Sequence, residues 1–141
     1  MAKIMALDYG LKRVGIAATD DLQIIASAIG TQPTAHIWEF LKTYLAQNQI
    51  EAVVLGDPKN LDGSATDATA PTEAFANEFR KRYPEIELHR MNEVFTSRIA
   101  RQTMVSGGMK KKQRQQKGMV DQISATIILQ DFLSRRSNGL F

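Results

Sequence analysis

The sequence has no cysteine, only two histidines and no long apolar run among its 141 residues. Without cysteine there can be no disulfide bond, no thiolate nucleophile and no cysteine-bound zinc site, which fits a reducing cytosol. No apolar stretch approaches the roughly 18 residues that cross a bilayer. The N-terminus also lacks the basic segment and apolar stretch of a secretory signal. We therefore expect a cytoplasmic protein with no membrane partner.

The length of the chain sets the expected domain organisation. A chain of 141 residues and 15.7 kDa can bury one proper hydrophobic core and is expected to form one domain. We assign residues 1–136 to that domain and residues 137–141 to a C-terminal tail.

Positive charge is concentrated in one segment. The net charge is only +3, but residues 94–120 contain no acidic residue and seven basic ones: Arg98, Arg101, Lys110, Lys111, Lys112, Arg114 and Lys117. The rest of the chain holds 11 basic residues against 15 acidic ones, a balance of −4. Such clustering predicts a polyanionic partner. The alternative is a solvated run on the surface.

Apolar runs predict three sequential strands over residues 3–8, 13–19 and 24–29. Short links between them, with Asp20-Asp21 as the second turn, predict an antiparallel meander. Apolar residues at helical spacing then predict a helix that begins at Thr34 as its N-cap and extends to Asn48. Trp38 lies beside the apolar stripe of this helix, and we expect it to pack against the core.

The remaining elements alternate between strand and helix. Strands are predicted over residues 51–56 and 86–91, and helices over residues 71–83, 96–105 and 119–135. A long polar loop precedes residue 71, and a basic loop of residues 107–118 precedes the last helix. A strand reached through a helix usually runs parallel to its neighbour. The order therefore predicts an α/β fold, with a five-stranded mixed sheet of three antiparallel strands then two parallel ones, and helices on both faces.

Three carboxylates fall at the ends of predicted elements. Asp8 ends the first strand, Glu93 follows the fifth, and Asp121 lies in the first turn of the last helix. Ligand sites of open sheets gather beyond the carboxyl ends of the strands. Clustered carboxylates repel unless a cation neutralises them, and oxygen ligands suit Mg²⁺ or Mn²⁺ rather than zinc. Two such ions support phosphodiester cleavage, so these acids and the basic segment together predict a nuclease. For Asp8 alone, the alternative is a residue that caps a turn.

Four blocks of the sequence resemble, in this order, the motifs of the YqgF family, also called RuvX: Asp8-Tyr9-Gly10 with Lys12-Arg13-Val14-Gly15, then Gly56 to Gly63, then Asn92-Glu93 with Thr96-Ser97, then Lys117-Gly118 with Val120-Asp121 and Ser124-Ala125. The resemblance covers almost the whole chain. It implies an RNase H-like fold and a RuvC-like protein, described as a pre-16S rRNA nuclease or as Holliday-junction-resolvase-like. It also implies that Asp8, Glu93 and Asp121 are the catalytic acids and the ligands of Mg²⁺ or Mn²⁺.

The expected partner is nucleic acid, with RNA as the first expectation and structured DNA as the alternative. The residues expected to bind its phosphates are basic: Lys12, Arg13, Lys110, Lys111, Lys112, Arg114 and Lys117. A role in ribosomal RNA processing implies contact with the ribosome or its precursor. We expect a monomer rather than a dimer. A junction resolvase would need two active sites and generally a dimer, so a monomer would weaken that alternative.

The chain departs from the family pattern at two places. The family often has Asp-Glu-Arg where this chain has Asn92-Glu93-Val94, and it usually has an apolar residue in place of Asp57. The first departure keeps a second hypothesis open, a nucleic-acid-binding module of the same fold with little or no activity. The second suggests Asp57 as a fourth carboxylate at the metal site, against the alternative of a turn-forming aspartate before Pro58.

Overall fold

The computed structural model describes residues 2–57, 69–92 and 119–137, and of residues 57, 92, 119–121 and 137 it describes the backbone alone. The predicted helix over residues 96–105, the basic loop of residues 107–118, Glu93 and the tail from residue 138 onward lie outside the described residues. In the described part of the chain, no helix is both long and apolar enough to cross a membrane.

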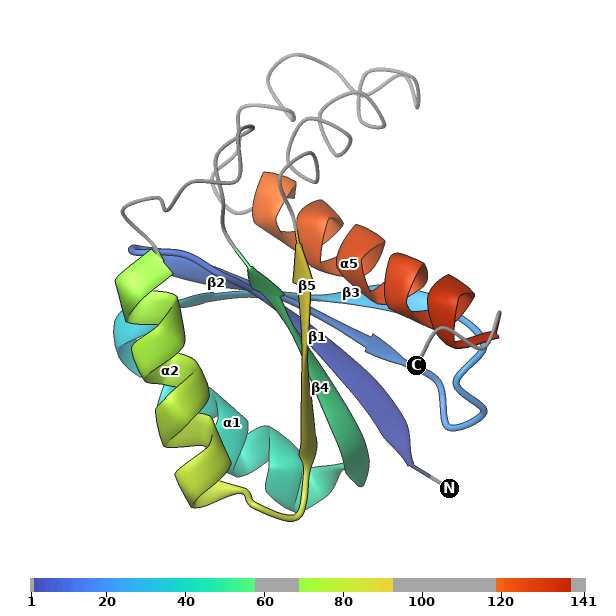
Figure 1. Cartoon of the computed structure of the whole chain (residues 1–141), viewed down its shortest axis with the longest axis horizontal. Coiled ribbons are helices and arrows are strands. Elements are labelled where there is room, and N and C mark those ends of the chain that lie inside the picture. Colours follow the sequence, from blue (N-terminus) through green and yellow to red (C-terminus); the bar gives the residue numbers. More distant parts are fainter. Residues whose placement is uncertain (1, 58–68, 93–118, 138–141) are drawn as a thin grey trace.

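The described strands form one five-stranded sheet in the order β3-β2-β1-β4-β5 (Figure 1). Their bounds are β1 Lys3–Tyr9, β2 Arg13–Thr19, β3 Ala26–Pro33, β4 Ile50–Asp57 and β5 Glu87–Asn92. Strands β1, β2 and β3 pair antiparallel, whereas β4 runs parallel to both β1 and β5. The predicted mixed sheet of three antiparallel strands and two parallel ones is therefore confirmed, and the fourth strand borders the first.

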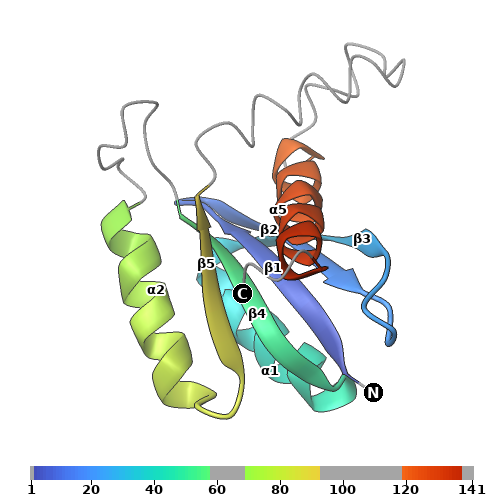
Figure 2. The same ribbon diagram turned by 45° about the vertical axis from the view of Figure 1, so that its right-hand side comes forward.

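Helices cover both faces of this sheet, as predicted (Figure 2). A 3₁₀ helix η1 (Thr34–His36) leads into α1 (Ile37–Gln47), which lies with α2 (Thr69–Arg82) on one face. The last helix, α5 (Met119–Ser137), lies on the other face and packs chiefly on β1, β2 and β3. Both views show α5 beginning on the side of the sheet where β4 and β5 end.

The alternation of side chains along β1 divides the core in two. Met5 and Leu7 are buried on the face covered by α1 and α2, whereas Ile4 and Ala6 are buried on the α5 face. Each face thus has its own apolar cluster, and successive strand residues contribute to opposite clusters because strand side chains alternate with period two. Leu7 and Asp8 therefore belong to opposite faces of the sheet.

The third strand begins later than the sequence predicted. Residues 24–29 were expected to form it, but β3 spans Ala26–Pro33. The Asp20 carboxylate accepts hydrogen bonds from the backbone N–H groups of Ile24 and Ile25 at 2.8 and 2.9 Å. These bonds close a loop before the ladder starts, and they leave the two isoleucine side chains 67% and 63% exposed. An apolar pair that looked like strand core is in fact the surface of a turn.

The start of the first helix also differs from the prediction. Thr34 was expected to be an N-cap, but it begins the 3₁₀ helix, whose N-cap is Pro33 and has no side-chain capping bond. The apolar stripe of α1 is as predicted, since Ile37 and Leu41 are buried. Trp38 packs as expected, stacked on Phe75 with ring centroids 4.7 Å apart.

Candidate active site at the carboxyl edge of the sheet

Asp8 lies one residue before the end of β1, at the edge of the sheet where the parallel strands end. Leu7 and Tyr9 pack toward α1 and α2, so the alternation of β1 places Asp8 on the α5 face. Its side chain is only 9% exposed. Its partner on β2 is Gly15, which has no side chain. A buried carboxylate is costly unless hydrogen bonds or a cation meet it, so its burial at this edge is compatible with a bound cation.

Strands β4 and β5 end next to each other at the same edge. Asp57 and Asn92 form the last pair of their ladder, and Glu93 is the residue that follows. The structure places Asp57 and Asn92 by their backbones only, and Glu93 lies outside the described residues. Along β5, Met91 belongs to the α5-side core and the His89 ring lies 4.9 Å from the ring of Phe132 on α5. Odd-numbered positions of β5 therefore face α5.

The first turn of α5 lies toward this edge, and Asp121 is in that turn as predicted. Its side chain is outside the described residues. One turn later, Ser124 and Ala125 are fully buried, and within the described residues the Ser124 hydroxyl has no hydrogen-bond partner. Sequence reasoning gave Ser124 no role. Its burial could have been expected from the sequence, because Ser124 lies next to Ala125 and four residues before Ile128, on the buried side of the helix.

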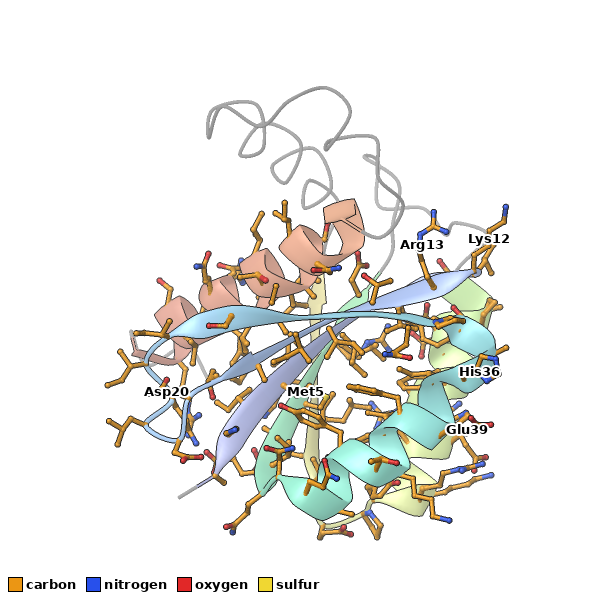
Figure 3. All side chains as sticks on the ribbon, turned by 180° about the vertical axis from the view of Figure 1, so that it is seen from behind. Met5, Lys12, Arg13, Asp20, His36 and Glu39 are labelled. Carbon is orange, nitrogen blue, oxygen red and sulfur yellow. The ribbon has the colours of Figure 1, made fainter. Side chains whose placement is uncertain are left out.

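The predicted basic pair lies in the turn between β1 and β2. Lys12 is exposed and Arg13 is half-buried. In Figure 3 both side chains lie at the end of the hairpin that is far from Asp20, and Asp8 lies in the preceding strand. The turn closes through a 3.0 Å bond from the Gly10 N–H to the Arg13 carbonyl. A Cβ at Gly10 would stand 2.8 Å from that same carbonyl oxygen, so the turn requires glycine there.

Tyr9, the neighbour of Asp8, is anchored on the opposite face. Its ring centroid lies 4.7 Å from that of Phe75 on α2. Burial raises the pKa of the Tyr9 phenol above its ordinary value, so Tyr9 is a neutral hydroxyl at neutral pH and does not act as a base. Its role is to pack the end of β1 against the helices.

The described side chains at this edge offer few ligands for the expected Mg²⁺ or Mn²⁺. Within the described residues, no three His, Asp or Glu side chains lie close enough to hold an ion. Of the three predicted acids, only Asp8 has a described side chain. It supplies a buried carboxylate, and carboxylate oxygen is the ligand type that Mg²⁺ and Mn²⁺ prefer. The described part of the site therefore fits a hard cation.

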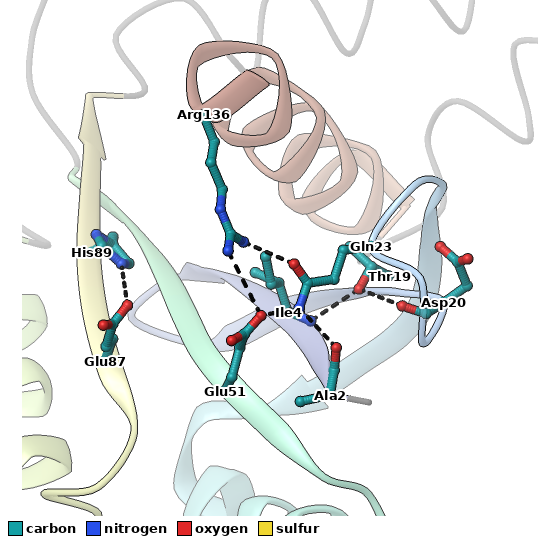
Figure 4. A network of polar contacts seen from close by, with 9 residues as sticks. All are labelled: Ala2, Ile4, Thr19, Asp20, Gln23, Glu51, Glu87, His89 and Arg136. Atoms are coloured by element: carbon teal, nitrogen blue, oxygen red, sulfur yellow. Dashed lines mark hydrogen bonds and ion pairs between the residues drawn. The ribbon is translucent and has the colours of Figure 1, made fainter. Parts of the chain in front are cut away.

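A hollow lies away from this edge, beside the C-terminal part of α5. Its volume is about 260 Å³, and it is lined by Glu51, Ala52, Glu87, His89, Phe132 and Arg136. Ala52 and Glu87 pair at the start of β4 and β5, at the opposite end from Asp57 and Asn92. Figure 4 shows that its charged groups bond one another, with His89 to Glu87 at 3.2 Å and Arg136 to Glu51 at 3.8 Å. None of the predicted acids is among the described residues that line this hollow, so the candidate site is the one at the other edge.

Solved structures with a similar fold belong to RuvC. Thermus thermophilus RuvC in complex with a Holliday junction substrate matches with a TM-score of 0.53 and 14% sequence identity, covering 96% of each chain. The structure of Thermus thermophilus RuvC itself matches equally well, with a TM-score of 0.53 and 12% identity. At such low identity the likeness shows the fold alone. The chain has a RuvC-like, RNase H-like fold, and Asp8 lies at the carboxyl edge of its sheet.

Sequence comparison assigns the family within this fold. The RuvX family, described as Holliday junction resolvase, matches residues 2–135. A Flavobacterium johnsoniae protein named "Putative pre-16S rRNA nuclease" is 46% identical over 136 residues, which cover 96% of this chain and 99% of the relative. A Bacteroides thetaiotaomicron protein of the same name is 43% identical with the same coverage. The chain belongs to the RuvX family, as its motifs indicated.

Proposed function

We propose that this chain is a divalent-metal-dependent endonuclease that cleaves phosphodiester bonds in RNA, and that its substrate is the precursor of 16S rRNA. The observation that carries this is the buried carboxylate of Asp8 at the carboxyl edge, beside Gly15 and on the face covered by α5. The names of the relatives support the same reaction and the same substrate. Processing of a ribosomal precursor would place the protein in the cytoplasm, in contact with that precursor.

The metal ligands we propose are Asp8, Glu93 and Asp121, with Mg²⁺ or Mn²⁺ as the ion. When bound at carboxylates, such ions activate a water and stabilise the leaving oxygen of a phosphodiester. Glu93 follows a strand whose odd-numbered positions, His89 and Met91, face α5. Asp121 is in the first turn of α5 itself. The assignments of Glu93 and Asp121 rest on the places of these residues in the sequence, directly after β5 and at the start of α5. Asp57 remains a predicted fourth ligand.

The chain's own residues supply two further tasks. Lys12 and Arg13, in the turn that follows Asp8, are placed to hold phosphates of the substrate near the carboxylates. The basic residues between Lys110 and Lys117 would hold the substrate backbone further from the cut. Lysine is a point charge on a flexible stem, so it suits phosphates better than base edges. Substrate choice then depends on shape and on the precursor, rather than on a short base sequence.

The test is Asp8→Asn in a cleavage assay with a precursor 16S rRNA and a four-way DNA junction, each with and without Mg²⁺ or Mn²⁺. We expect wild type to cut the RNA only with metal, and Asp8→Asn to lose cleavage while its unfolding curve stays cooperative. Asp21→Asn, the same change at an exposed position, is the matched control and should cut as wild type does. Cleavage by Asp8→Asn at the wild-type rate would contradict the proposal.

A DNA junction resolvase is the second candidate, because the family carries that description. Symmetric resolution needs two active sites and generally a dimer, whereas we expect a monomer that cuts RNA. Cleavage of the junction but not of the precursor, by a species that elutes as a dimer, would favour the resolvase. Binding of either substrate with no cleavage in any metal would favour a binding module, as Asn92 and Val94 allow. Asp57→Asn in the same assay tests the fourth ligand.

A further inference from the structure

The turn that carries the basic pair is held from outside by one residue. Thr34 lies 24 positions from Gly10 in the sequence, yet its hydroxyl donates a 2.7 Å hydrogen bond to the Gly10 carbonyl. Its backbone N–H donates a second bond, at 3.0 Å, to the Lys12 carbonyl. With the Gly10 to Arg13 bond inside the turn, three hydrogen bonds fix four consecutive residues. We call this set of bonds the Thr34 clamp.

The clamp is built on a rigid part of the fold. Thr34 follows Pro33, which pairs with Arg13 in the first rung of the β2–β3 ladder. Proline fixes the backbone angle φ there at −58°. After Thr34 the chain passes through η1 into α1, where Ile37 and Leu41 are buried in the core. Because the chain is fixed on both sides of Thr34, by Pro33 before it and by η1 and α1 after it, the position of its hydroxyl does not depend on the turn. The hydroxyl can therefore restrain the turn.

The hydroxyl is not used for the helix that Thr34 begins. Threonine near a helix start commonly bonds the free N–H groups of the first turn, but η1 has no side-chain capping bond. Instead the hydroxyl bonds the carbonyl of Gly10, two residues after Asp8 and two before Lys12. The bond thus links the strand that carries the buried carboxylate to the turn that carries the two cations.

We propose that Thr34 is a positioning residue. It sets the place of Lys12 and Arg13 relative to Asp8, and thereby the affinity of the site for a phosphate of the substrate. This inference rests on the proposed function, since it assumes that the edge binds nucleic acid. Without the hydroxyl bond, the Gly10 side of the turn is released while the backbone bond to Lys12 remains. The two cations would then sample several positions. Ordering them on a phosphate would cost conformational entropy, which would weaken binding.

The experiment compares Thr34→Val, which removes the hydroxyl at nearly constant shape, with Thr34→Ser, which keeps it. Probes are a fluorescent single-stranded RNA and the precursor 16S rRNA. For Thr34→Val we expect affinity about three to ten times weaker, since the net contribution of one hydrogen bond between neutral groups corresponds to roughly a two- to tenfold change. KM should rise by a similar factor and kcat should stay within about twofold, because the acids are untouched. Thr34→Ser should restore wild-type binding.

Two readouts separate positioning from lost stability. Looser cations should lower the slope of log affinity against log salt by roughly 0.7 to 1.8, the value for one to two phosphate contacts, whereas a partly unfolded protein keeps its slope. Amide exchange at Gly10, measured without nucleic acid, should speed up in Thr34→Val and return in Thr34→Ser. Thr126→Val is the matched control, because it removes a 2.9 Å hydroxyl bond to the Gln122 carbonyl within α5. It should change neither the slope nor the exchange at Gly10.

Failure of this inference is distinct from failure of the proposed function. If Thr34→Val binds with wild-type affinity and slope, the clamp does not position the cations, even where Asp8→Asn has lost cleavage. Unchanged exchange at Gly10 would also overturn it. If Thr34→Val weakens binding while Asp8→Asn still cuts like wild type, the positioning role stands and the metal-dependent mechanism at Asp8 falls.

Discussion

At the scale of single residues, one carboxylate shapes a whole loop. Asp20 accepts hydrogen bonds from Ile25 and Ile24, and these backbone bonds, that of Ile25 first, hold the pKa of its carboxyl below the ordinary value. The ionised form is therefore the one that the fold prefers. The loop that results places Gln23 in the left-handed region, at φ 59°, where its side chain bonds Glu51 and the Ala2 carbonyl (Figure 4).

The lowered pKa of Asp20 predicts how stability depends on pH. The folded pKa lies below the unfolded one, so the contribution is complete above the ordinary value of about 3.9 and is lost as the pH falls through the folded pKa. We expect Asp20→Asn to be less stable than wild type at pH 6, and this difference to shrink at pH 3. Urea unfolding at both pH values measures it. Asp21→Asn controls for loss of a carboxylate in this loop, and an Asp20→Asn difference that grows in acid would contradict the prediction.

At the scale of elements, α5 holds the second core, and the predicted acid Asp121 belongs to its first turn. Its sheet-facing row comprises Ala125, Ile128, Leu129 and Phe132, which are all buried with residues of β1, β2, β4 and β5. The helix therefore depends on one row of side chains, and that row begins one turn after Asp121. Loosening this contact would alter the candidate site as well as the fold.

Phe132 tests how much that packing contributes. Its side chain is 2% exposed and its ring lies 4.9 Å from His89. Phe132→Ala should lower the free energy of unfolding by about 3 to 5 kcal/mol, the usual effect of removing a buried phenyl group. Leu133→Ala, at a partly buried neighbouring position, should lower it by clearly less. Equal losses in the two variants, measured by urea unfolding, would show that α5 is not held by its sheet-facing row.

Elements with a strong periodic pattern were predictable, and those decided by a single polar bond were not. The presence of β1, the apolar stripe of α1 and the burial of α5 follow from the apolar pattern, because burial selects that pattern. The start of β3 and the role of Thr34 do not follow from it. The first depends on a bond from a loop N–H to the Asp20 side chain, and the second on a bond from the Thr34 hydroxyl to the distant Gly10 carbonyl. For the site, element order brought Asp8 and the start of α5 to one edge. The hydrogen bonds that hold the basic turn could not be predicted from the sequence, because they join residues far apart in the chain.

At the scale of the whole molecule, charge is divided along the chain. The candidate acids come from β1, from the residue after β5 and from α5, whereas the seven cations of residues 94–120 come between the last two. The segment that carries the positive charge is therefore joined directly to two of the three acids. In the proposed function, the basic segment would hold the substrate and the acids would cut it, so substitutions in the two sets should change binding and cleavage separately.

This separation predicts the salt dependence of binding. Each phosphate neutralised by the protein releases counterions, so log affinity falls with log salt by roughly 0.7 per contact on a single strand and 0.9 on a duplex. Three to five contacts give a slope of about −2 to −4.5. Changing Lys110, Lys111 and Lys112 together to alanine should flatten the slope by roughly two to three units on every sequence alike. The rate at saturating substrate should change little, because the acids remain.

The control for that triple variant removes the same charge elsewhere. Lys42, Arg80 and Lys81 are exposed on α1 and α2, across the sheet from α5, so changing them to alanine should leave the slope at its wild-type value. A single-stranded RNA and a duplex of unrelated sequence, titrated at several salt concentrations, provide the measurement. If both triple variants lower affinity and slope by the same amount, the effect is one of net charge. If the first variant keeps the wild-type slope, residues 110–112 are a solvated surface run, and Lys12 and Arg13 would be the principal phosphate contacts.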